Sequence, residues 1–384
     1  MKHFDFILAG GGAAGLGLAY HMVHSPLKDC SILVIDKELK NKNDRTWCYW
    51  TAHPTILDTI IYHSWERLKF VSDDFEQIFN LSPYQYHMIR GIDFYEKTTQ
   101  ELSKHNVRFV YGTVEQIKDG EDRAEAIVNG TSYYGKWIFD SLFLPSEFRV
   151  DATRYHDVKQ HFKGWEIETD WDVFDPQIMT LFDFRIPQKR SMRFIYILPF
   201  SSRRALVEYT LFSANLLTEE EYTEGLNDYL ENTLGLKKYR ILAEEKGIIP
   251  MTDQPFARRG GKRILYTGTK GGRVKPSTGY AFSRIQQDSA AIVQSLLKYG
   301  DPFHLPKSPW VFRMSDSVML QLMYRHGDLM KSIFTQLFQN NPIHRIFHFL
   351  DETASPTELL LFMTSLSPLP FIKALLKLII LRRV

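Results

Sequence analysis

Apolar runs and glycines at the start of the chain follow the order of a βαβ unit. Residues 4–9 form a short apolar run, glycines follow at 10–12, and residues 13–22 have helical composition. A second apolar run, residues 31–35, is closed by Asp36. A strand, a glycine turn, a helix, a strand and an acidic residue in this order are typical of a dinucleotide-binding fold.

The pattern changes in the middle of the chain, where polar and apolar residues alternate. A period of two predicts strands with one face on a core, so we expect an antiparallel sheet. The alternating segments are 164–168, 193–198 and 205–211. Helical composition returns at 218–233 and 281–298, and from residue 315 onward the chain is mostly helical with breaks at prolines.

These segments predict a nucleotide-binding domain into which a sheet is inserted. With 384 residues the chain is too long for one ordinary core, which favours two or three domains. The predicted cofactor domain comprises residues 1–60, 90–145 and 246–300. The predicted substrate domain comprises residues 61–89 and 150–245, and residues 301–384 form a helical region that we expect to contact a membrane.

The glycines of the first turn match the G-x-G-x-x-G fingerprint as Gly10, Gly12 and Gly15. The first makes the tight turn, the second lets the backbone approach a pyrophosphate, and the third lets helix and strand pack closely. The helix start at Ala13 and Ala14 offers free N–H groups and the positive end of the helix dipole to phosphates. A plain glycine turn is the alternative, but the flanking elements are all in register with the motif.

The acidic residue after the second strand completes this prediction. A carboxylate at Asp36 can accept hydrogen bonds from the ribose hydroxyls of a dinucleotide. We therefore assign Asp36 and the following Lys37 to the cofactor site.

A second glycine-rich segment indicates which dinucleotide is bound. A strand ends at Gly268, and Pro276, Thr278 and Gly279 precede a helix. This resembles the second flavin-binding segment of hydroxylase-type flavoproteins, in which a Pro-x-x-Gly helix start approaches the isoalloxazine ring. Thr269 stands where those enzymes have Asp, which changes the side-chain contact to the ribityl chain but leaves the backbone contacts to the flavin. The alternative is an ordinary loop between a strand and a helix. The predicted fold is therefore α/β: a Rossmann-like FAD-binding domain of hydroxylase type with an inserted antiparallel substrate sheet and C-terminal helices.

Composition narrows the class of partner. The net charge of +2 at pH 7 gives no reason to expect nucleic acid. Two cysteines, Cys30 and Cys48, make no disulfide framework and indicate a reducing compartment. No His, Cys or Asp cluster has metal-ligand spacing and no apolar stretch reaches 18 residues, so we expect neither a metal site nor a membrane span.

Nine further segments resemble those of the bacterial lycopene β-cyclases. Residues 44–50 read Asp-Arg-Thr-Trp-Cys-Tyr-Trp, where Tyr49 replaces a Phe, and residues 275–280 read Lys-Pro-Ser-Thr-Gly-Tyr; these two are the most specific. A Phe-Asp-Ser match is followed by Leu142-Phe143, where the family has Arg-Gly. The resemblance covers about residues 4–300, and its supporting segments are 86–95, 139–141, 160–166, 179–185, 198–201, 207–210 and 247–251.

The resemblance implies a reaction without net redox change on lycopene or a related acyclic carotenoid. A proton adds to the terminal double bond of a linear ψ-end, a neighbouring double bond attacks the tertiary carbocation, and a second proton leaves to give a β-ring. The resemblance also implies FAD in its reduced form, which stabilises cationic charge, and NAD(P)H as the reductant. Arg45 is expected near the flavin, as in related flavoproteins.

Protonation of an alkene needs a strong acid in a dry site, because water would quench the cation. A carboxylic acid in an apolar wall keeps its proton at neutral pH. Glu208 shares a strand face with Leu206 and Thr210, and its Val-Glu-x-Thr setting resembles that of the family's essential Glu. We therefore predict that Glu208 is the general acid or part of the acid–base relay; the alternative is an edge-strand Glu that faces water.

Glu166 and Asp183 are secondary candidates for this acid–base chemistry. Glu166 shares a strand face with Glu168, and Asp183 shares one with Arg185. The alternative for Asp183 is a structural ion pair with Arg185.

The C-terminal residues 370–384 are apolar except for Lys373, Lys377, Arg382 and Arg383. The two lysines lie four residues apart on one helix face, which suits a helix on a bilayer surface. We therefore expect a cytoplasmic protein that associates peripherally with the membrane and receives its polyene from lipid. A helix docked on the protein's own core is the alternative.

Two other functions fit the same cofactor motifs, because a fold does not fix a function. One is an FAD-dependent oxidoreductase, a monooxygenase or reductase, that acts on an isoprenoid lipid. The other is a flavin-containing lipid carrier without chemistry. The oxidoreductase would lack the segment at 44–50 and a buried Glu, whereas the carrier would leave its bound carotenoid unchanged.

Overall fold

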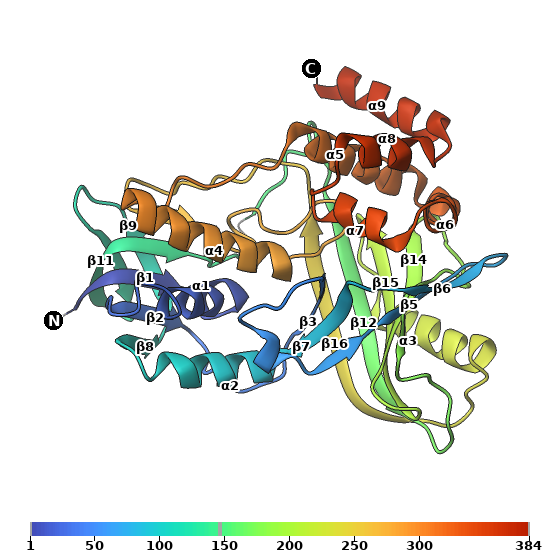
Figure 1. The fold of residues 1–384 in the computed structure, drawn as a ribbon, viewed down its shortest axis with the longest axis horizontal. Coiled ribbons are helices and arrows are strands. Elements are labelled where there is room, and N and C mark those ends of the chain that lie inside the picture. Colours follow the sequence, from blue (N-terminus) through green and yellow to red (C-terminus); the bar gives the residue numbers. More distant parts are fainter. Residues whose placement is uncertain (1, 145–147, 383–384) are drawn as a thin grey trace.

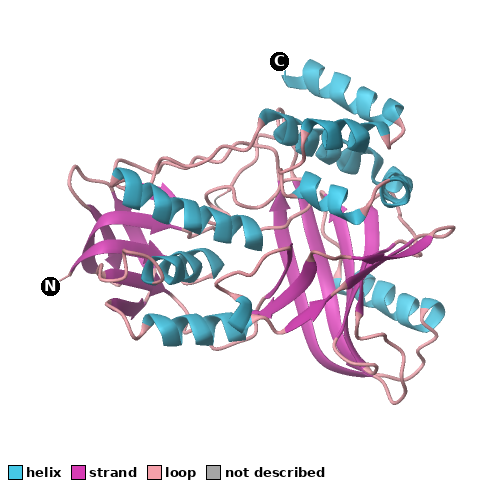
Figure 2. Cartoon of the chain, in the orientation of Figure 1, coloured by secondary structure: helices cyan, strands magenta, loops and turns pink. Residues whose placement is uncertain are grey.

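The computed structural model describes residues 2–144 and 148–382, so residues 1, 145 and 383–384 of the predicted domains lie outside the described part. Two large sheets stand side by side, and helices pack on both (Figures 1 and 2). In Figure 1 the N-terminal sheet lies on the left, the second sheet on the right, and the last helices above the second sheet. The predicted α/β class with an antiparallel sheet and C-terminal helices is confirmed.

The first sheet contains the predicted βαβ unit. Its strand order is β8-β2-β1-β11-β10-β9, and β17 also pairs with β11. Strands β8, β2, β1, β11 and β17 are parallel, whereas β9, β10 and β11 form an antiparallel meander. The strands are β1 (His3–Ala9), β2 (Ile32–Asp36), β8 (Val107–Tyr111), β9 (Val114–Lys118), β10 (Ala124–Val128), β11 (Thr131–Asp140) and β17 (Ile264–Tyr266).

Three helices cover one face of this sheet: α1 (Ala13–Val23), α2 (Gly91–Leu102) and α4 (Phe282–Tyr299). Leu8 of β1 packs with Phe94 of α2 and Ile292 of α4 in one buried cluster. Ile7 points to the other face, where it packs against the meander. Because β1 is buried on both faces, it reads as a continuous apolar run rather than an alternating one.

The second sheet has the order β16-β12-β15-β14-β13-β5-β6, and all of its pairs are antiparallel except β13 with β5. Its strands are β5 (Arg67–Val71), β6 (Glu76–Asn80), β12 (Val158–Glu168), β13 (Ile178–Asp183), β14 (Met192–Pro199), β15 (Arg204–Ser213) and β16 (Arg240–Met251). The boundary that we predicted at residue 246 therefore falls inside a strand of this sheet.

Helices cover both faces of the second sheet. Val207 and Tyr209 of β15 pack toward α3 (Glu219–Asp228) and the π-helical turn Tyr229–Thr233 that follows it. Leu206 and Phe212 of the same strand belong to the cluster on the opposite face, under the C-terminal helices. These helices are α5 (Trp310–His326), α6 (Met330–Asn340), α7 (Ile343–Leu350), α8 (Pro356–Thr364) and α9 (Pro368–Arg382), with short 3-10 turns at Asp58–Ile60 and Gly327–Leu329.

A small third sheet joins the two regions. It has the order β3-β7-β4 and consists of β3 (Thr46–Thr51), β7 (Gln85–Arg90) and β4 (His63–Trp65). Trp47 of β3 stacks on Phe282 of α4, and Trp50 stacks on Phe347 of α7. One strand of the family-like segment thus contacts both the cofactor region and the C-terminal helices.

Candidate active site

A large cavity runs along the junction of the two sheets. Its volume is about 1810 Å³, which exceeds the roughly 300–1,000 Å³ of an ordinary small-molecule pocket. It begins at the first glycine turn, passes the cavity-facing side of β12 and β15, and ends among the C-terminal helices. This cavity has room for a dinucleotide and a long second ligand together.

The cofactor end of the cavity is formed by the start of α1. Gly10, Gly12, Ala13 and Ala14 line it, whereas Gly15 does not. Gly10 has a φ of +106°, and a Cβ on it would lie 2.3 Å from Oγ of Ser141, so glycine is required there. A Cβ on Gly15 would lie 1.8 Å from the carbonyl oxygen of Gly10, so Gly15 allows the close packing of helix and turn.

This end of the cavity fits the pyrophosphate of FAD. A Cβ on Gly12 would meet no atom within 4 Å, and among the described residues no side chain caps the first N–H groups of α1. Helix N-termini with free N–H groups bind phosphate. The space and the donors are therefore both present where the sequence predicts them.

The predicted ribose contact lies beside the glycine turn. Asp36 lines the cavity and accepts hydrogen bonds from the backbone N–H groups of Gly11 (2.7 Å) and Glu38 (2.8 Å). A carboxylate has about four acceptor positions, so these bonds leave capacity for ribose hydroxyls. Lys37 and Arg45 also line the cavity.

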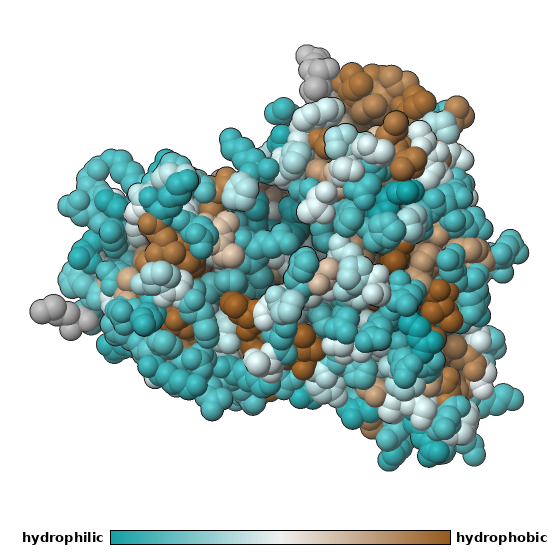
Figure 3. Space-filling view, viewed as in Figure 1, coloured by the Kyte–Doolittle hydropathy of each residue, from teal (hydrophilic) through white to brown (hydrophobic). Residues whose placement is uncertain are grey.

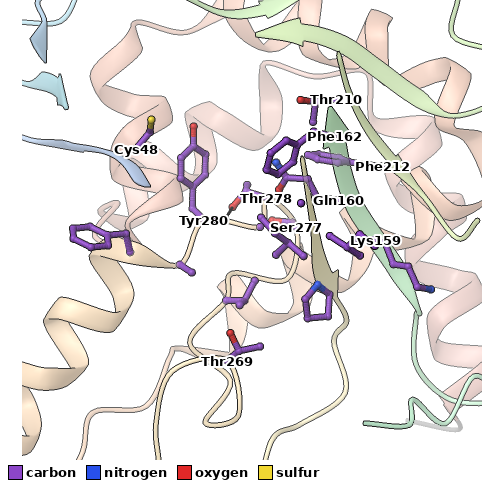
Figure 4. A pocket seen from close by; sticks show the side chains of 18 of the residues that line it. Cys48, Lys159, Gln160, Phe162, Thr210, Phe212, Thr269, Ser277, Thr278 and Tyr280 are labelled. Carbon is purple, nitrogen blue, oxygen red and sulfur yellow. Dashed lines mark hydrogen bonds between the residues drawn. The ribbon is translucent and has the colours of Figure 1, made fainter. Parts of the chain in front are cut away.

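The second flavin-like segment faces the same space. Gly268, Thr278 and Gly279 line the cavity, whereas Pro276 does not. Gly268 and Gly279 have φ values of +58° and +73°, which favour glycine. Figure 4 shows Thr278 beside Gln160 of β12.

Gln160 gives a further indication of a ligand at this place. A Cβ on Gly279 would lie 1.9 Å from its Oε1, so the flavin-like segment lies directly against β12. That oxygen is buried and has no hydrogen-bond partner among the described residues. Buried polar atoms are normally paired, so an unpaired acceptor beside this segment fits a ligand donor.

The predicted acid lies deeper in the cavity. Glu208 is 8% exposed and lines the cavity on β15, where it is directly opposite Tyr196 of β14 and Gly164 of β12. Gly164 in turn pairs with Glu245 of β16. Burial and the adjacent Glu245 carboxylate raise the pKa of Glu208 well above its ordinary value, so it keeps its proton at neutral pH.

Three tyrosines and a cysteine form a neutral polar cluster next to this acid. The hydroxyl of Tyr86 is 2.8 Å from that of Tyr196 and 2.9 Å from that of Tyr280. Burial raises the pKa of these three phenols and of the Cys48 thiol, so all four are uncharged at neutral pH. In Figure 4, Cys48 and Tyr280 lie on the left, and Phe162, Thr210 and Phe212 on the right.

The far end of the cavity is apolar. It is lined by side chains of β13, β14, α6, α7, α8 and α9. The apolar side chains at this end include Leu181, Phe182, Phe194, Phe334, Leu337, Phe338, Phe347, Phe362, Leu366, Phe371, Ile372 and Leu375. An elongated hydrocarbon is the chemical class that such a surface fits.

The two secondary candidates lie elsewhere, which corrects our prediction. Neither Glu166 nor Asp183 is among the described residues that line the cavity. Glu166 forms an ion pair with Arg204. Asp183 is fully buried on the α3 face, where Arg185 (2.5 Å) and the hydroxyl of Tyr229 (2.6 Å) bind its carboxylate. Both carboxylates thus have structural partners, and neither is among the groups that raise the pKa of Glu208.

The sequence reasoning also missed residues that the structure places beside Glu208. Glu245 received no role, and Tyr86, Tyr196 and Tyr280 were not singled out. Tyr86 and Tyr280 lie in two of the family-like segments, which was the available signal. For Glu245 the signal is weaker, because only the pairing of three strands brings it to Glu208.

Comparisons with known proteins bear on this geometry. The family model described as "Lycopene cyclase protein" matches residues 5–376. The "Lycopene beta-cyclase" of Pantoea ananas is 24% identical over 299 residues, which cover 73% of this chain and 71% of that protein. The "Lycopene beta cyclase, chloroplastic" of Arabidopsis thaliana is 24% identical over 328 residues, which cover 78% of this chain. "Neoxanthin synthase, chloroplastic" of Solanum tuberosum is 24% identical over 309 residues, which cover 77% of this chain. The match spans 61% of the length of both plant proteins.

Solved structures share the fold along nearly the whole chain. A geranylgeranyl bacteriochlorophyll reductase-like protein of Thermoplasma acidophilum has a TM-score of 0.62 at 13% identity, with 98% of this chain and 99% of that chain covered. The p-nitrophenol 4-monooxygenase PnpA of Pseudomonas putida has a TM-score of 0.59 at 15% identity, with 100% and 99% covered. At these identities the likeness establishes the fold of FAD-dependent flavoproteins and no particular activity.

Proposed function

Because the chain belongs to the lycopene cyclase family, we propose that it is a lycopene β-cyclase, an isomerase that closes the linear ψ-ends of lycopene into β-rings. Closure of one end gives γ-carotene, and closure of the second gives β-carotene. The observation that carries the proposal is the position of Glu208. It is a buried carboxylic acid in the wall of a cavity that joins the two cofactor segments to an apolar arm.

Glu208 donates the proton that starts the reaction. Its O–H bond breaks as a C–H bond forms at the terminal double bond, which leaves a tertiary carbocation. A neighbouring double bond of the same polyene supplies the electron pair that closes the ring. Loss of a second proton gives the ring alkene, so one proton enters, one leaves, and no electron is gained or lost.

The walls around Glu208 protect the cation from water. Phe182, Phe194 and Phe334 present aromatic rings to the apolar arm, and such rings attract a cation through their faces. The hydroxyls of the tyrosine cluster are hydrogen-bonded to one another, which holds the three side chains in place beside the acid. An apolar lining also raises the free energy of water in the site.

The residues at the cofactor end fit FAD. Gly12, Ala13 and Ala14 would hold the pyrophosphate, Asp36 the ribose, and the segment from Gly268 to Gly279 the ring system. In its reduced form the flavin supplies negative charge that stabilises a nearby cation. We propose NAD(P)H as the reductant on the strength of the family resemblance.

The C-terminal helices support a location at a membrane surface. Their exposed apolar side chains are Leu360, Leu361, Met363, Leu369, Ile372, Leu375, Leu376, Ile379 and Ile380. Figure 3 shows hydrophobic side chains gathered over this end of the molecule. Ala374 and Leu378 of α9 are buried, so one face of α9 packs on the protein while the other is exposed.

Several side chains of α8 and α9 also line the cavity, which supports a route for the polyene from lipid to Glu208. Among the described helices no single one is long and apolar enough to cross a membrane; α8 and α9 reach the required length and composition only together, with a bend of 109° between them. Lys373 and Lys377 are exposed, and Arg383 lies outside the described residues. We therefore propose peripheral attachment on the cytoplasmic side through α8 and α9.

Expression of the chain in cells that accumulate lycopene tests the proposal. We expect lycopene to be replaced by γ-carotene and β-carotene, which liquid chromatography separates by retention time and absorption spectrum. An oxidoreductase on isoprenoid lipids would instead give hydroxylated or reduced polyenes, and a carrier would leave lycopene unchanged. Unchanged lycopene in the presence of a flavin-loaded, reduced protein would exclude cyclase activity.

A further inference from the structure

A second glutamate, Glu245, lies on the other side of Gly164 from Glu208, and this glycine has no side chain to separate them. Strand β12 runs between β15 and β16, and its Gly164 pairs with Glu208 on one side and with Glu245 on the other. A Cβ on Gly164 would lie 2.7 Å from Cγ of Glu208 and 3.3 Å from Cγ of Glu245. Both side chains therefore reach over the same glycine, and both line the cavity.

We propose that Glu208 and Glu245 act as one acid, a carboxyl–carboxylate pair that shares a single proton over Gly164. The inference rests on the proposed cyclase function and adds Glu245 to the catalytic residues. Two carboxyl groups this close do not both ionise at neutral pH, because like charges in a site of low polarity repel strongly. Such a pair titrates as a unit rather than as two independent groups.

The surroundings of the two carboxyl groups differ in burial and in hydrogen bonding. Glu208 is 8% exposed, and among the described residues its one carboxylate neighbour in the cavity is Glu245. Glu245 is half-buried and accepts a hydrogen bond of 2.6 Å from the Thr46 hydroxyl. Glu245 is therefore the more solvated member of the pair, and Glu208 is the drier one.

The other titratable groups that face the pair stay neutral over the working pH range. They are Cys48 from β3, Tyr86 from β7, Tyr196 from β14 and Tyr280 from the segment before α4. The basic residues nearest in register, Lys163 and Lys246, form ion pairs with Glu219 of α3. Among the described groups that face Glu208, Glu245 is therefore the one whose carboxylate raises the pKa of Glu208.

The shared proton closes the catalytic cycle without solvent. When Glu208 protonates the alkene, the pair becomes doubly negative at the moment when the carbocation forms, and the opposite charges attract. The second proton, released from the ring carbon beside the cation, returns to the pair. One proton leaves and one returns, so the pair is ready for the second ψ-end.

The pH dependence of ring formation tests this assignment. The wild-type rate should fall as pH rises through the pKa of Glu208. Glu245→Gln removes the like charge, so the same fall should occur at a pH lower by about one unit or more. The control is Glu244→Gln, because Glu244 is adjacent on β16 but binds Trp165 (3.1 Å) and Lys163 (3.2 Å), which keeps its ion pair with Glu219, and is not among the described cavity residues. It should leave the pH profile unchanged.

Infrared spectroscopy of the FAD-loaded enzyme provides a measurement that needs no turnover. The difference spectrum between wild type and Glu208→Gln isolates the C=O stretch of protonated Glu208. That band should disappear at a lower pH in Glu245→Gln than in wild type. An identical titration in the two proteins would overturn the shared-proton assignment.

Gly164→Ala provides a second test if Glu245→Gln does not fold, because it changes the residue between the two glutamates and retains both carboxyl groups. The added methyl group would separate the carboxyl groups, so we expect the infrared band to shift its titration to lower pH and the rate to fall at least about tenfold. An unchanged band and rate would again refute the pair. A wild-type enzyme that forms no ring would defeat the cyclase proposal, whereas the infrared titration would still test the pair itself.

Discussion

Two buried carboxyl groups lie on opposite faces of the same antiparallel sheet, and their neighbours differ in sign. On the α3 face, Asp183 is 1% exposed and is bound by the Arg185 guanidinium and the Tyr229 hydroxyl. On the cavity face, Glu208 is 8% exposed and meets another carboxylate, Glu245. Burial alone therefore does not make a proton donor. A positive partner holds a buried carboxylate ionised, and a negative partner keeps its neighbour protonated.

The largest expected effect is on the cavity face. Glu208→Gln removes the proposed proton donor and should reduce ring formation by about 10² to 10⁴-fold. FAD binding should persist, because Glu208 belongs to neither flavin segment and Gln has nearly the same size as Glu. Lycopene turnover and flavin absorbance measured on the same preparation separate the two effects. Full activity would remove Glu208 from the mechanism.

The same substitution should change stability with a defined sign. The pKa of Glu208 is raised in the folded protein, so the folded state holds a proton that the unfolded state has lost above its ordinary pKa. Wild-type stability should therefore fall as pH rises from the ordinary pKa of Glu toward the raised one. Glu208→Gln lacks this dependence, so it should gain stability relative to wild type over that range in denaturant melts.

A substitution on the α3 face should lower the stability of the protein rather than its turnover rate. Asp183→Asn leaves Arg185 without its counter-ion and should lower the free energy of unfolding by about 2 to 3 kcal/mol. The side chain of Arg185 is 36% exposed, which keeps the cost below that of a fully buried pair. Activity per folded, FAD-loaded molecule should stay near that of wild type. A loss of turnover without a loss of stability would restore Asp183 as a catalytic candidate.

A smaller change on the same face sharpens the comparison. Tyr229→Phe removes only the 2.6 Å hydrogen bond to Asp183 and should cost about 1.5 to 2 kcal/mol of stability. Its counterpart on the cavity face is Tyr196→Phe, which removes a hydroxyl opposite Glu208. Chemical denaturation and initial rates on both variants should show a stability effect for the first and a rate effect for the second.

The smallest effect is expected for Glu166. Its partner Arg204 is 41% exposed, and ion pairs near the surface contribute about 0 to 1 kcal/mol. Glu166→Gln should therefore change neither the unfolding midpoint nor ring formation appreciably. A large loss of activity in this variant would show that the cavity extends to the Arg204 end of the sheet.

The parts of this site that are local in sequence could be predicted. The turn at Gly10, Gly12 and Gly15 and the acid Asp36 depend on residues within one βαβ unit, and the structure places Gly10, Gly12 and Asp36 on the cavity. Glu208 was found because its strand alternates and its segment is family-like. In both cases spacing along one chain segment fixes the geometry.

The parts that depend on strand pairing could not be predicted in the same way. Alternation tells which residues share a face, but not which face meets the cavity, and this is why Asp183 was assigned a catalytic role. Glu245 reaches Glu208 only because β12 lies between their two strands and carries a glycine at the crossing point. The pairing of strands far apart in the sequence is set by the whole sheet rather than by any local pattern.

The most direct test of proton-initiated closure is the deuterium content of rings formed in D₂O. Glu208 exchanges its proton with solvent before lycopene binds, so the first β-ring to close should carry one deuterium on the carbon that receives the first proton. Mass spectrometry of β-carotene from the purified, reduced holoenzyme reads this number. Ring product free of deuterium would contradict a mechanism that begins with an exchangeable acid.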